Sequence, residues 1–311
     1  MNYLVTGAAG FIGSKIAGSL IKQGHKVTTI DNLSTGYESN IPNLCKFIKG
    51  DISNYTIAKL RNEKFDAILH IAGQSSGELS FEDPVNDLSS NTTSTLLLLN
   101  FAIENKCKRF IYASTMSIYG ESEGKEKFSE LDTPHPKSLY AVGKLASENY
   151  LEIFNEHYGI IYTSLRYFNV YGPGQNLENL KQGMVSIYLK QFIDSNFPVV
   201  EVKGSLDRFR DLSYIDDVVD VTIESIHNKG FFNLVVNIGS GKKTKVKKVI
   251  ELMHGYLGSN KNIKLSNGTP GDQFGIYANN SRLKSICNIE FRPFSEGLKN
   301  MLEELNILKI K

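Results

Sequence analysis

Residues 1–16 read MNYLVTGAAGFIGSKI, and this stretch decides the fold. A short run of apolar and β-branched residues leads into three glycines, Gly7, Gly10 and Gly13, after which the pattern becomes helical. Gly7 permits the tight turn out of the strand, Gly10 lets the backbone approach a pyrophosphate, and Gly13 lets the helix pack closely. Because the free N–H groups at the start of a helix bind phosphate well, the stretch predicts a dinucleotide-binding turn.

The next strand-like run strengthens this interpretation. Residues 26–31 read KVTTID and end in Asp31. A carboxylate at the end of the second strand accepts hydrogen bonds from an adenosine ribose and repels a 2′-phosphate. In a chain with 26 glycines a glycine triplet alone is weak evidence. The strand, the triplet, the helix and the acid together predict NAD as the cofactor, in preference to NADP.

Strand and helix patterns alternate along the first half of the chain. Short apolar runs, namely YLVTG, KVTTID, CKFIKGD, FDAILHIAG and RFIYAST, are separated by segments with helical period. The alternation predicts an α/β fold, a Rossmann-type doubly wound parallel sheet with helices on both faces. After about Phe168 the rhythm loosens, and it returns at YIDDVVDVTIESIH and NLVVNIG. We expect an NAD-binding domain from residues 1–168 plus about 211–242, and a smaller, discontinuous substrate lobe from about 169–210 and 243–311.

Composition excludes several classes of protein. With 311 residues and 41% hydrophobic residues, the chain can bury a sizeable core. Its 35 basic and 33 acidic side chains nearly balance, so nucleic acid and anionic membranes are not expected partners. The three cysteines are far apart and have no histidine at metal-ligand spacing, so neither a disulfide nor a metal site is expected. No apolar stretch approaches the ~20 residues of a membrane span, and the first strand begins too early for a signal peptide, so we expect a cytoplasmic protein.

Tyr140 and Lys144 are the candidate catalytic pair. The same Tyr-x-x-x-Lys spacing occurs at Tyr55 and Lys59, so the motif alone decides nothing. Tyr140, however, begins a long helix that follows the strand RFIYAST, whose C-terminal end should lie at the ligand crevice. An ammonium ~5 Å away, at an effective dielectric of about 20, supplies ~3.3 kcal/mol toward ionising the phenol, and an oxidised nicotinamide ring adds more. Tyr140 is predicted to take the proton of a substrate alcohol, with Thr115 bonded to the same oxygen.

Eight runs occur in a characteristic order: TGAAGFIG, DNLSTG, GDI, HIAGQSS, YASTMSIYG, YAVGK, RYFNVYGPGQ and RDLSYIDDV. Together they resemble the extended short-chain dehydrogenase/reductase family that modifies nucleotide sugars, and most of all its epimerase branch. The similarity covers nearly the whole chain and weakens after about Gly241.

The resemblance implies NAD as the cofactor, a nucleotide sugar as the substrate, and site residues for each. The implied catalytic residues are Thr115, Tyr140 and Lys144. The implied cofactor contacts are Gly7, Gly10, Phe11, Ile12, Gly13, Asp31, Asn32, Asp51, Ile52, Ile71, Ala72, Gly73, Asn91, Tyr140, Lys144, Tyr167 and Phe168. The implied substrate contacts are Gln74, Ser75, Thr115, Ser117, Asn169, Arg208, Arg210 and Asp272.

Departures from the family pattern narrow the reaction. Dehydratases of the family carry an acidic pair directly after the hydroxyl residue, whereas here Met116 and Ser117 follow Thr115. Without that acid no group is placed for elimination of water. No cysteine follows closely to deprotonate carbon 5, as relatives that epimerise carbons 3 and 5 require. The expected chemistry is therefore oxidation and reduction at carbon 4.

Other departures concern the diphosphate. Epimerases of the family commonly hold it between two arginines, and here Arg210 matches the first while Thr269 stands in the place of the second. Arg208 is a candidate substitute, since a guanidinium can bind phosphate with two parallel hydrogen bonds; the alternative is a plain surface arginine. Ser75 stands where relatives usually carry a lysine near the cofactor phosphates.

Three functions remain open. The first is an NAD-dependent nucleotide-sugar 4-epimerase for polysaccharide or glycoconjugate precursors. The second is a 4-dehydrogenase that releases the keto sugar, and the third is a non-catalytic NAD(H)-sensing protein, for which Thr115, Tyr140 and Lys144 would be unnecessary. The helices expected at about residues 87–105 and 140–158 are apolar on more than one side. In this family such helices pair into a four-helix bundle, so we expect a homodimer.

Overall fold

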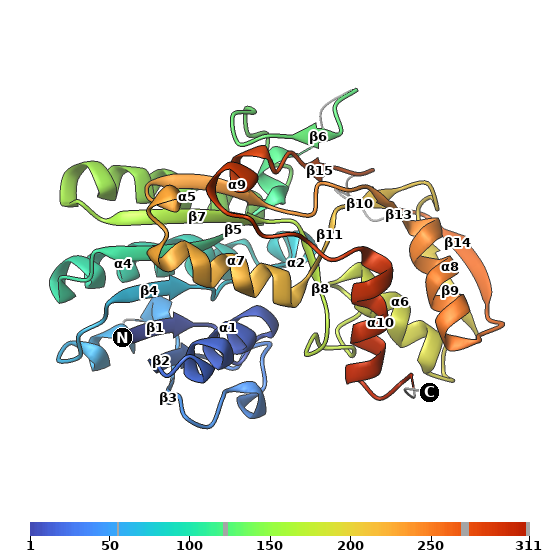
Figure 1. Cartoon of the computed structure of the whole chain (residues 1–311), viewed down its shortest axis with the longest axis horizontal. Coiled ribbons are helices and arrows are strands. Elements are labelled where there is room, and N and C mark those ends of the chain that lie inside the picture. The colour runs from blue at the N-terminus through green and yellow to red at the C-terminus, as the bar shows by residue number, and fades with distance from the viewer. Residues whose placement is uncertain (55, 121–123, 269–273, 309–311) are drawn as a thin grey trace.

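A seven-stranded parallel sheet forms the centre of the molecule (Figure 1). The structure is a computed structural model, and it describes residues 1–54, 56–120, 124–268 and 274–308. The strand order is β12-β7-β5-β4-β1-β2-β3, and every pairing in this sheet is parallel. The strands are β1 (Asn2–Thr6), β2 (Lys26–Asp31), β3 (Lys46–Lys49), β4 (Ala67–His70), β5 (Arg109–Thr115), β7 (Ile161–Tyr167) and β12 (Leu234–Ile238). This order confirms the predicted Rossmann-type fold.

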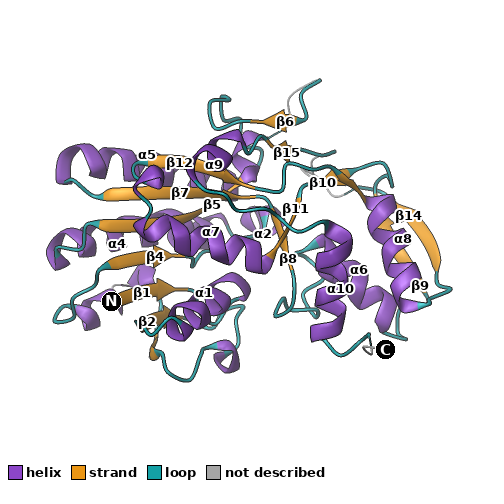
Figure 2. Ribbon diagram, viewed as in Figure 1, coloured by secondary structure: helices purple, strands orange, loops and turns teal. Residues whose placement is uncertain are grey.

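Helices cover both faces of the sheet (Figure 2). Alternate residues of β1 point to opposite faces, so Tyr3 and Val5 join one apolar cluster with α1 and α7, while Leu4 joins another with α4 and α5. The strands are therefore buried on both sides, which explains their nearly continuous apolar sequences. These helices are α1 (Phe11–Lys22), α4 (Ser94–Asn105), α5 (Leu139–Tyr158) and α7 (Ile215–His227).

The helix expected over residues 87–105 consists of three consecutive pieces. It begins as α3 (Pro84–Leu88), passes through one π-helical turn at Ser89–Thr93, and continues as α4. A π turn inside a helix is rare and frequently lies at a functional site. The helix expected from residue 140 is α5, which is capped where Ser138 Oγ accepts a hydrogen bond from Ala141 N at 3.2 Å.

A second, smaller group of elements lies beyond the C-terminal ends of the sheet strands (Figure 1). Its two small sheets pair β9 with β14 in parallel and β10 with β13 in antiparallel, and three helices pack around them. The elements are α6 (Met184–Ile193), β9 (Val199–Lys203), β10 (Phe209–Arg210), β13 (Thr244–Lys245), α8 (Val246–Leu257), β14 (Asn262–Ser266) and α10 (Phe294–Glu304).

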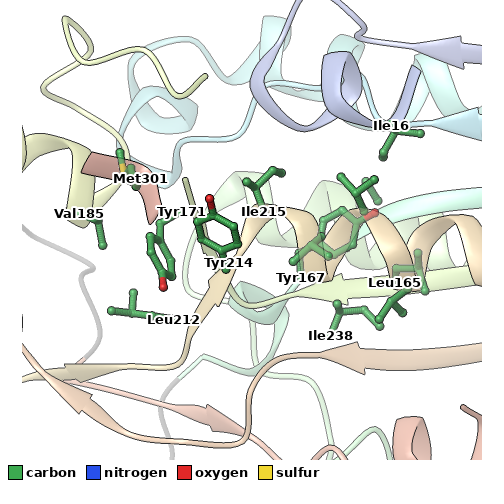
Figure 3. Close-up of a cluster of buried hydrophobic side chains, with 14 of the residues drawn as sticks. Ile16, Leu165, Tyr167, Tyr171, Val185, Leu212, Tyr214, Ile215, Ile238 and Met301 are labelled. Atoms are coloured by element: carbon green, nitrogen blue, oxygen red, sulfur yellow. The ribbon is translucent and has the colours of Figure 1, made fainter. Parts of the chain in front are cut away.

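One apolar cluster runs without a break from the sheet into this lobe (Figure 3). Between the two parts, β8 (Asn169–Tyr171) pairs in parallel with β11 (Leu212–Tyr214). The rings of Tyr171 and Tyr214 meet edge to face, 5.6 Å apart, and α10 adds Met301 to the same cluster. The lobe and the sheet domain therefore share a core, which fixes the lobe above the strand ends.

Part of the range expected for the lobe packs on the sheet domain instead. β15 (Tyr277–Ala278) pairs with β6 (Lys127–Phe128), and α9 (Ser281–Ile286) lies against β12. Leu283 of α9 is 1% exposed in the core cluster. The expected lobe range 243–311 is thus too broad, because residues 277–286 bury their apolar side chains against the first domain.

The remaining elements are short. They are α2 (Gly77–Glu82) and the 3-10 turns Glu38–Asn40, Ile52–Asn54, Thr56–Leu60, Met116–Tyr119 and Lys229–Phe231. None of the helices in the described part of the chain has the length and apolar character needed to cross a membrane.

Candidate active site

The glycine turn between β1 and α1 has the shape that the sequence predicts. Gly7 has φ +75°, a left-handed conformation, and its N–H donates to Ile30 O at 3.0 Å. A Cβ on Gly13 would lie 2.1 Å from Gly7 O, so any side chain there would push α1 away from the strand. Gly10 caps α1 without a side-chain hydrogen bond, and the first N–H groups of a helix have no partner within the helix. These residues fit a pyrophosphate.

Asp31 ties the end of β2 to this turn. One of its carboxylate oxygens accepts a hydrogen bond from Ala9 N at 2.9 Å. Next to it, Asn32 Nδ2 donates to Asp51 Oδ2 at 2.8 Å. Burial acts to raise the pKa of Asp51, but hydrogen bonds from Ser53 and Asn32 outweigh it and lower that pKa. The predicted ribose and adenine contacts Asp31, Asn32 and Asp51 therefore lie together beside the glycine turn.

Tyr140, Lys144 and Thr115 meet at the C-terminal end of β5. Lys144 Nζ donates to Ala113 O at 2.9 Å and lies 4.9 Å from the centre of the Tyr112 ring and 6.0 Å from that of Tyr140. Thr115 lies near enough to Tyr140 to act on the pKa of its phenol, which it lowers. All three predicted catalytic side chains are buried, with exposures between 4 and 8%. The structure thus brings them together in one dry site.

Burial determines the charge states of this pair. It raises the pKa of Tyr140 to about 12, where Thr115 acts to lower it and the charge of Asp87 adds to the rise. It lowers the pKa of Lys144 to about 8, against the charges of Asp87 and Glu148. The expectation that the lysine and an oxidised nicotinamide together draw the phenol toward neutral pH did not include the cost of burying a phenolate, which acts in the opposite direction.

Asn91 and Gly73 complete the wall next to Lys144. Asn91 Nδ2 donates to Gln74 O and to Asp87 Oδ1, both at 3.0 Å. Asn91 Oδ1 is buried and has no hydrogen-bond partner among the described residues. A Cβ on Gly73 would lie 2.5 Å from this oxygen and 3.1 Å from Lys144 Nζ. A buried acceptor without a donor fits a bound polar group at this place, as predicted for the cofactor.

Several predicted contact residues use their side chains within the protein. Tyr167 is buried in the core, and its hydroxyl lies 2.8 Å from Thr222 Oγ1. Phe168 is 2% exposed and packs 6.4 Å from the Tyr119 ring. Tyr167 is the last residue of β7 and Phe168 follows it, and the side chains of both are packed inside the protein. The other predicted cofactor contacts lie at the start of α1 or just after β3 and β4. They are Phe11, Ile12, Ile52, Ile71 and Ala72.

Three of the predicted sugar contacts, Gln74, Ser75 and Ser117, lie in the segments that follow β4 and β5. Gln74 Nε2 donates to Ser76 O at 2.7 Å and to Asp87 at 2.9 Å, so its amide is engaged inside the protein. Ser75 Oγ accepts a hydrogen bond from Gln182 Nε2 at 2.7 Å, which joins the loop before α6 to the loop after β4. Ser117 N donates to Thr115 Oγ1 at 3.1 Å.

Met116 and Asn169 close the site on the side of the lobe. Asn169 Nδ2 lies 3.4 Å from Met116 Sδ. The position where dehydratases carry an acid therefore presents a thioether, which has no proton to give.

The two predicted phosphate arginines differ in burial. Arg210 is 7% exposed and donates to the carbonyls of Phe209 and Phe274, at 2.8 and 3.2 Å. Arg208 is half-buried and donates to Lys203 O at 2.7 Å. The predicted contact Asp272 and the departure at Thr269 lie outside the described residues.

Sequence reasoning missed two buried groups. Asp87 is 2% exposed beside the catalytic pair; its spacing of four residues from Asn91 on one helix is the signal that could have revealed it. Arg166 and Glu148 form a buried ion pair with N···O distances of 2.7 and 3.0 Å. A buried arginine near the end of a strand requires such a partner, and Glu148 lies one turn after Lys144.

Known proteins share this architecture. Residues 3–239 match the NAD-dependent epimerase/dehydratase family, and the chain belongs to this family, in its extended short-chain dehydrogenase/reductase branch. It is an enzyme family whose cofactor is NAD.

Three solved structures are similar over nearly their whole length. A UDP-glucose 4-epimerase from Thermotoga maritima, with UDP-glucose, is 32% identical with a TM-score of 0.93, covering 98% of this chain and 99% of that one. A UDP-N-acetylglucosamine 4-epimerase from Methanobrevibacter ruminantium, in complex with UDP-N-acetylmuramic acid, is 30% identical with a TM-score of 0.91, covering 98% of each chain. A UDP-glucose 4-epimerase from Thermus thermophilus, in complex with NAD, is 29% identical with a TM-score of 0.88, covering 98% of this chain and 99% of that one.

Proposed function

We propose that this protein is an NAD-dependent 4-epimerase of nucleotide sugars that supplies precursors of polysaccharides or glycoconjugates. The observation that carries the proposal is the group of Thr115, Tyr140 and Lys144 at the end of β5, with Met116 instead of an acid next to it. These residues can move a proton on and off an alcohol, whereas Met116, which directly follows Thr115, has no proton with which to help expel water. The similar structures named for UDP-sugar 4-epimerases support the same reaction.

The protein residues would handle the proton and the sugar. The glycine turn and Asp31 would hold NAD, which would supply the oxidation and the later reduction at carbon 4. Tyr140 would accept the proton of the carbon-4 hydroxyl, and Thr115 would hold the same oxygen. Because burial raises the pKa of Tyr140 to about 12, positive charge in the site would be required to favour the phenolate at neutral pH. After oxidation the keto sugar would rotate in the site to present its opposite face, and Tyr140 would return the proton to the oxygen at carbon 4.

The second candidate is a 4-dehydrogenase that releases the keto sugar. Weaker binding of the diphosphate would favour the dehydrogenase. Thr269 stands in place of an arginine, and both Arg208 and Arg210 already donate to backbone carbonyls. A charge-assisted contact contributes roughly 1.5 to 3 kcal/mol. Losing one such contact weakens retention of the intermediate, but two arginines and Asn169 remain, so we favour the epimerase.

A panel of nucleotide sugars tests the proposal. The purified protein is incubated with UDP, GDP, CDP and dTDP hexoses, and the products are identified by NMR. The expected result is slow equilibration of one sugar with its 4-epimer. Release of a 4-keto sugar, or turnover of none of them, would exclude the epimerase.

We propose further that the protein is a homodimer through α3 and α5. Val85 and Leu88 on α3 are 74% and 55% exposed, and Val142 and Ile153 on α5 are 50% and 48% exposed. On α5 these apolar side chains lie on the face opposite Lys144, at helical spacing. A second copy would cover this surface, which a monomer would leave in water.

Ile153→Glu is expected to convert the dimer to a monomer, because it would bury a carboxylate at the centre of the helix pairs. Light scattering should give twice the mass of 34.7 kDa for the native chain and the single mass for the variant. Glu152→Lys, which alters an exposed charge outside the apolar stripe, should stay dimeric. A native chain that is monomeric at micromolar concentration would rule out this interface.

A further inference from the structure

Asp87 is a buried carboxylate for which the proposed mechanism has no use. It lies in α3 and is 2% exposed. Its Oδ1 accepts hydrogen bonds from Gln74 Nε2 at 2.9 Å and from Asn91 Nδ2 at 3.0 Å. Gln74 comes from the loop after β4, and Asn91 from the π turn, so two separate segments hold the carboxylate in place. Burying a carboxylate costs free energy, and the hydrogen bonds from the two side-chain amides offset part of this cost.

The Asp87 carboxylate faces α5 next to Lys144. A Cβ on Gly143, the residue before Lys144, would lie 3.8 Å from Asp87 Oδ2 and 3.1 Å from Thr92 Oγ1. Thr92 Oγ1 also donates to Gly143 O at 3.3 Å, so the π turn is fastened to α5 at this point. Asp87 interacts electrostatically with both Lys144 and Tyr140. The glycine thus allows the carboxylate to approach the catalytic helix.

The charges around Lys144 leave Asp87 as the balancing anion. The titratable groups that face Lys144 are Asp87, Glu148, Tyr140, Tyr112 and His70. Glu148 also acts to raise the pKa of Lys144, but less than Asp87 does, and it is ion-paired with Arg166. Burial, with the charge of Lys144, lowers the pKa of His70 well below its usual range, and burial raises the pKa of both tyrosines, so these three groups are neutral.

We propose that Asp87, held by Gln74 and Asn91, is a positioning residue whose buried carboxylate keeps Lys144 protonated beside Tyr140. Its effect on turnover rests on the proposed function, whereas its effect on the charge of Lys144 does not. Burial alone would favour loss of the lysine proton, and a fixed carboxylate opposes this at a site that water does not screen. The carboxylate thereby raises the pH up to which Lys144 remains a cation beside Tyr140.

Titration of Lys144 in the full chain tests the proposal. Lysines are labelled with 13C at Cε, and the resonance that disappears in Lys144→Met is followed by NMR against pH. The native midpoint should be about 8. In Asp87→Asn, which keeps the shape and one acceptor, it should fall by about one unit. Asp83→Asn makes the same change at the exposed cap of α3 and should leave it unchanged. An unchanged midpoint in Asp87→Asn overturns the proposal.

If circular dichroism shows that Asp87→Asn does not fold, a second measurement tests the same proposal. Coupling between two charges is reciprocal, so Lys144→Met should raise the midpoint of the Asp87 carboxyl, followed with 13C-labelled aspartate. No movement of that midpoint would also overturn the proposal.

Kinetics separate positioning from a purely structural role. Removing the Asp87 charge should lower the pKa of both Lys144 and Tyr140, because the carboxylate raises both. With a sugar that is turned over, both limbs of the pH–rate profile of Asp87→Asn should move to lower pH. A lower rate at all pH values with an unmoved profile contradicts the proposal. If the native protein turns over no sugar, the proposed function fails, while the Lys144 titration still decides the role of Asp87.

Discussion

Tyr140→Phe is expected to reduce turnover of the best nucleotide sugar by at least ~100-fold, the usual scale of general acid–base assistance. The change removes one oxygen and keeps the ring that packs near Lys144. Thr115 would still bind the substrate oxygen, but no side chain would remain to take its proton. Because the phenol is buried and its pKa is about 12, the lost hydroxyl cannot be replaced simply by bulk water.

The measurement compares kcat and NAD affinity in the native chain and the variant. NAD affinity should change by less than about threefold, since the glycine turn is untouched. Tyr158→Phe, which removes an exposed hydroxyl at the far end of α5, is the matched control and should keep native turnover. Near-native turnover by Tyr140→Phe would show that another group moves the proton.

Gly13→Ala is expected to reduce NAD affinity by at least ~30-fold, or about 2 kcal/mol, the usual scale of forcing one atom into a filled space. The new Cβ would lie 2.1 Å from Gly7 O and 2.7 Å from Gly7 C, both rigid backbone atoms. The start of α1 would have to move away from the turn, and its N–H groups would move with it.

Calorimetric titration with NAD measures this change, and thermal unfolding reports stability in parallel. Gly255→Ala is the control, because a Cβ there meets nothing within 4 Å and alanine favours helix α8. It should bind NAD as the native chain does and unfold at an equal or slightly higher temperature. Native affinity in Gly13→Ala would mean that NAD does not use this turn.

The sheet was predictable because its signals are local. Six of the seven strands match short runs recognised in the sequence, whereas β7, which reads IYTSLRY and contains three polar residues, was not among them. The glycine turn and Asp31 identify which end of the sheet binds the cofactor. The path of the chain after residue 242 was less predictable, since the pairing of β15 with β6 joins segments about 150 positions apart. Two-residue strands have no periodicity from which a partner might be recognised.

The sequence predicted which residues form the catalytic group, but not the pKa values of these residues or the buried charge next to them. The pair Tyr140 and Lys144 follows from helical spacing, and the structure places both with Thr115. The pKa of Tyr140 depends on how deeply the ring is buried, which no spacing reveals. Asp87 escaped notice because a single acid in an apolar helix pattern ordinarily faces water, and only the tertiary contacts with Gln74 and Gly143 show otherwise.

The central claim is that the hydrogen removed from carbon 4 returns to carbon 4 of the same sugar. The most direct measurement uses a nucleotide sugar deuterated at that carbon, incubated with the protein and unlabelled NAD, and locates the label by NMR and mass spectrometry. We expect the deuterium at carbon 4 of both epimers, with only a small steady fraction of reduced cofactor. Stoichiometric deuterated NADH together with a free 4-keto sugar would contradict the account.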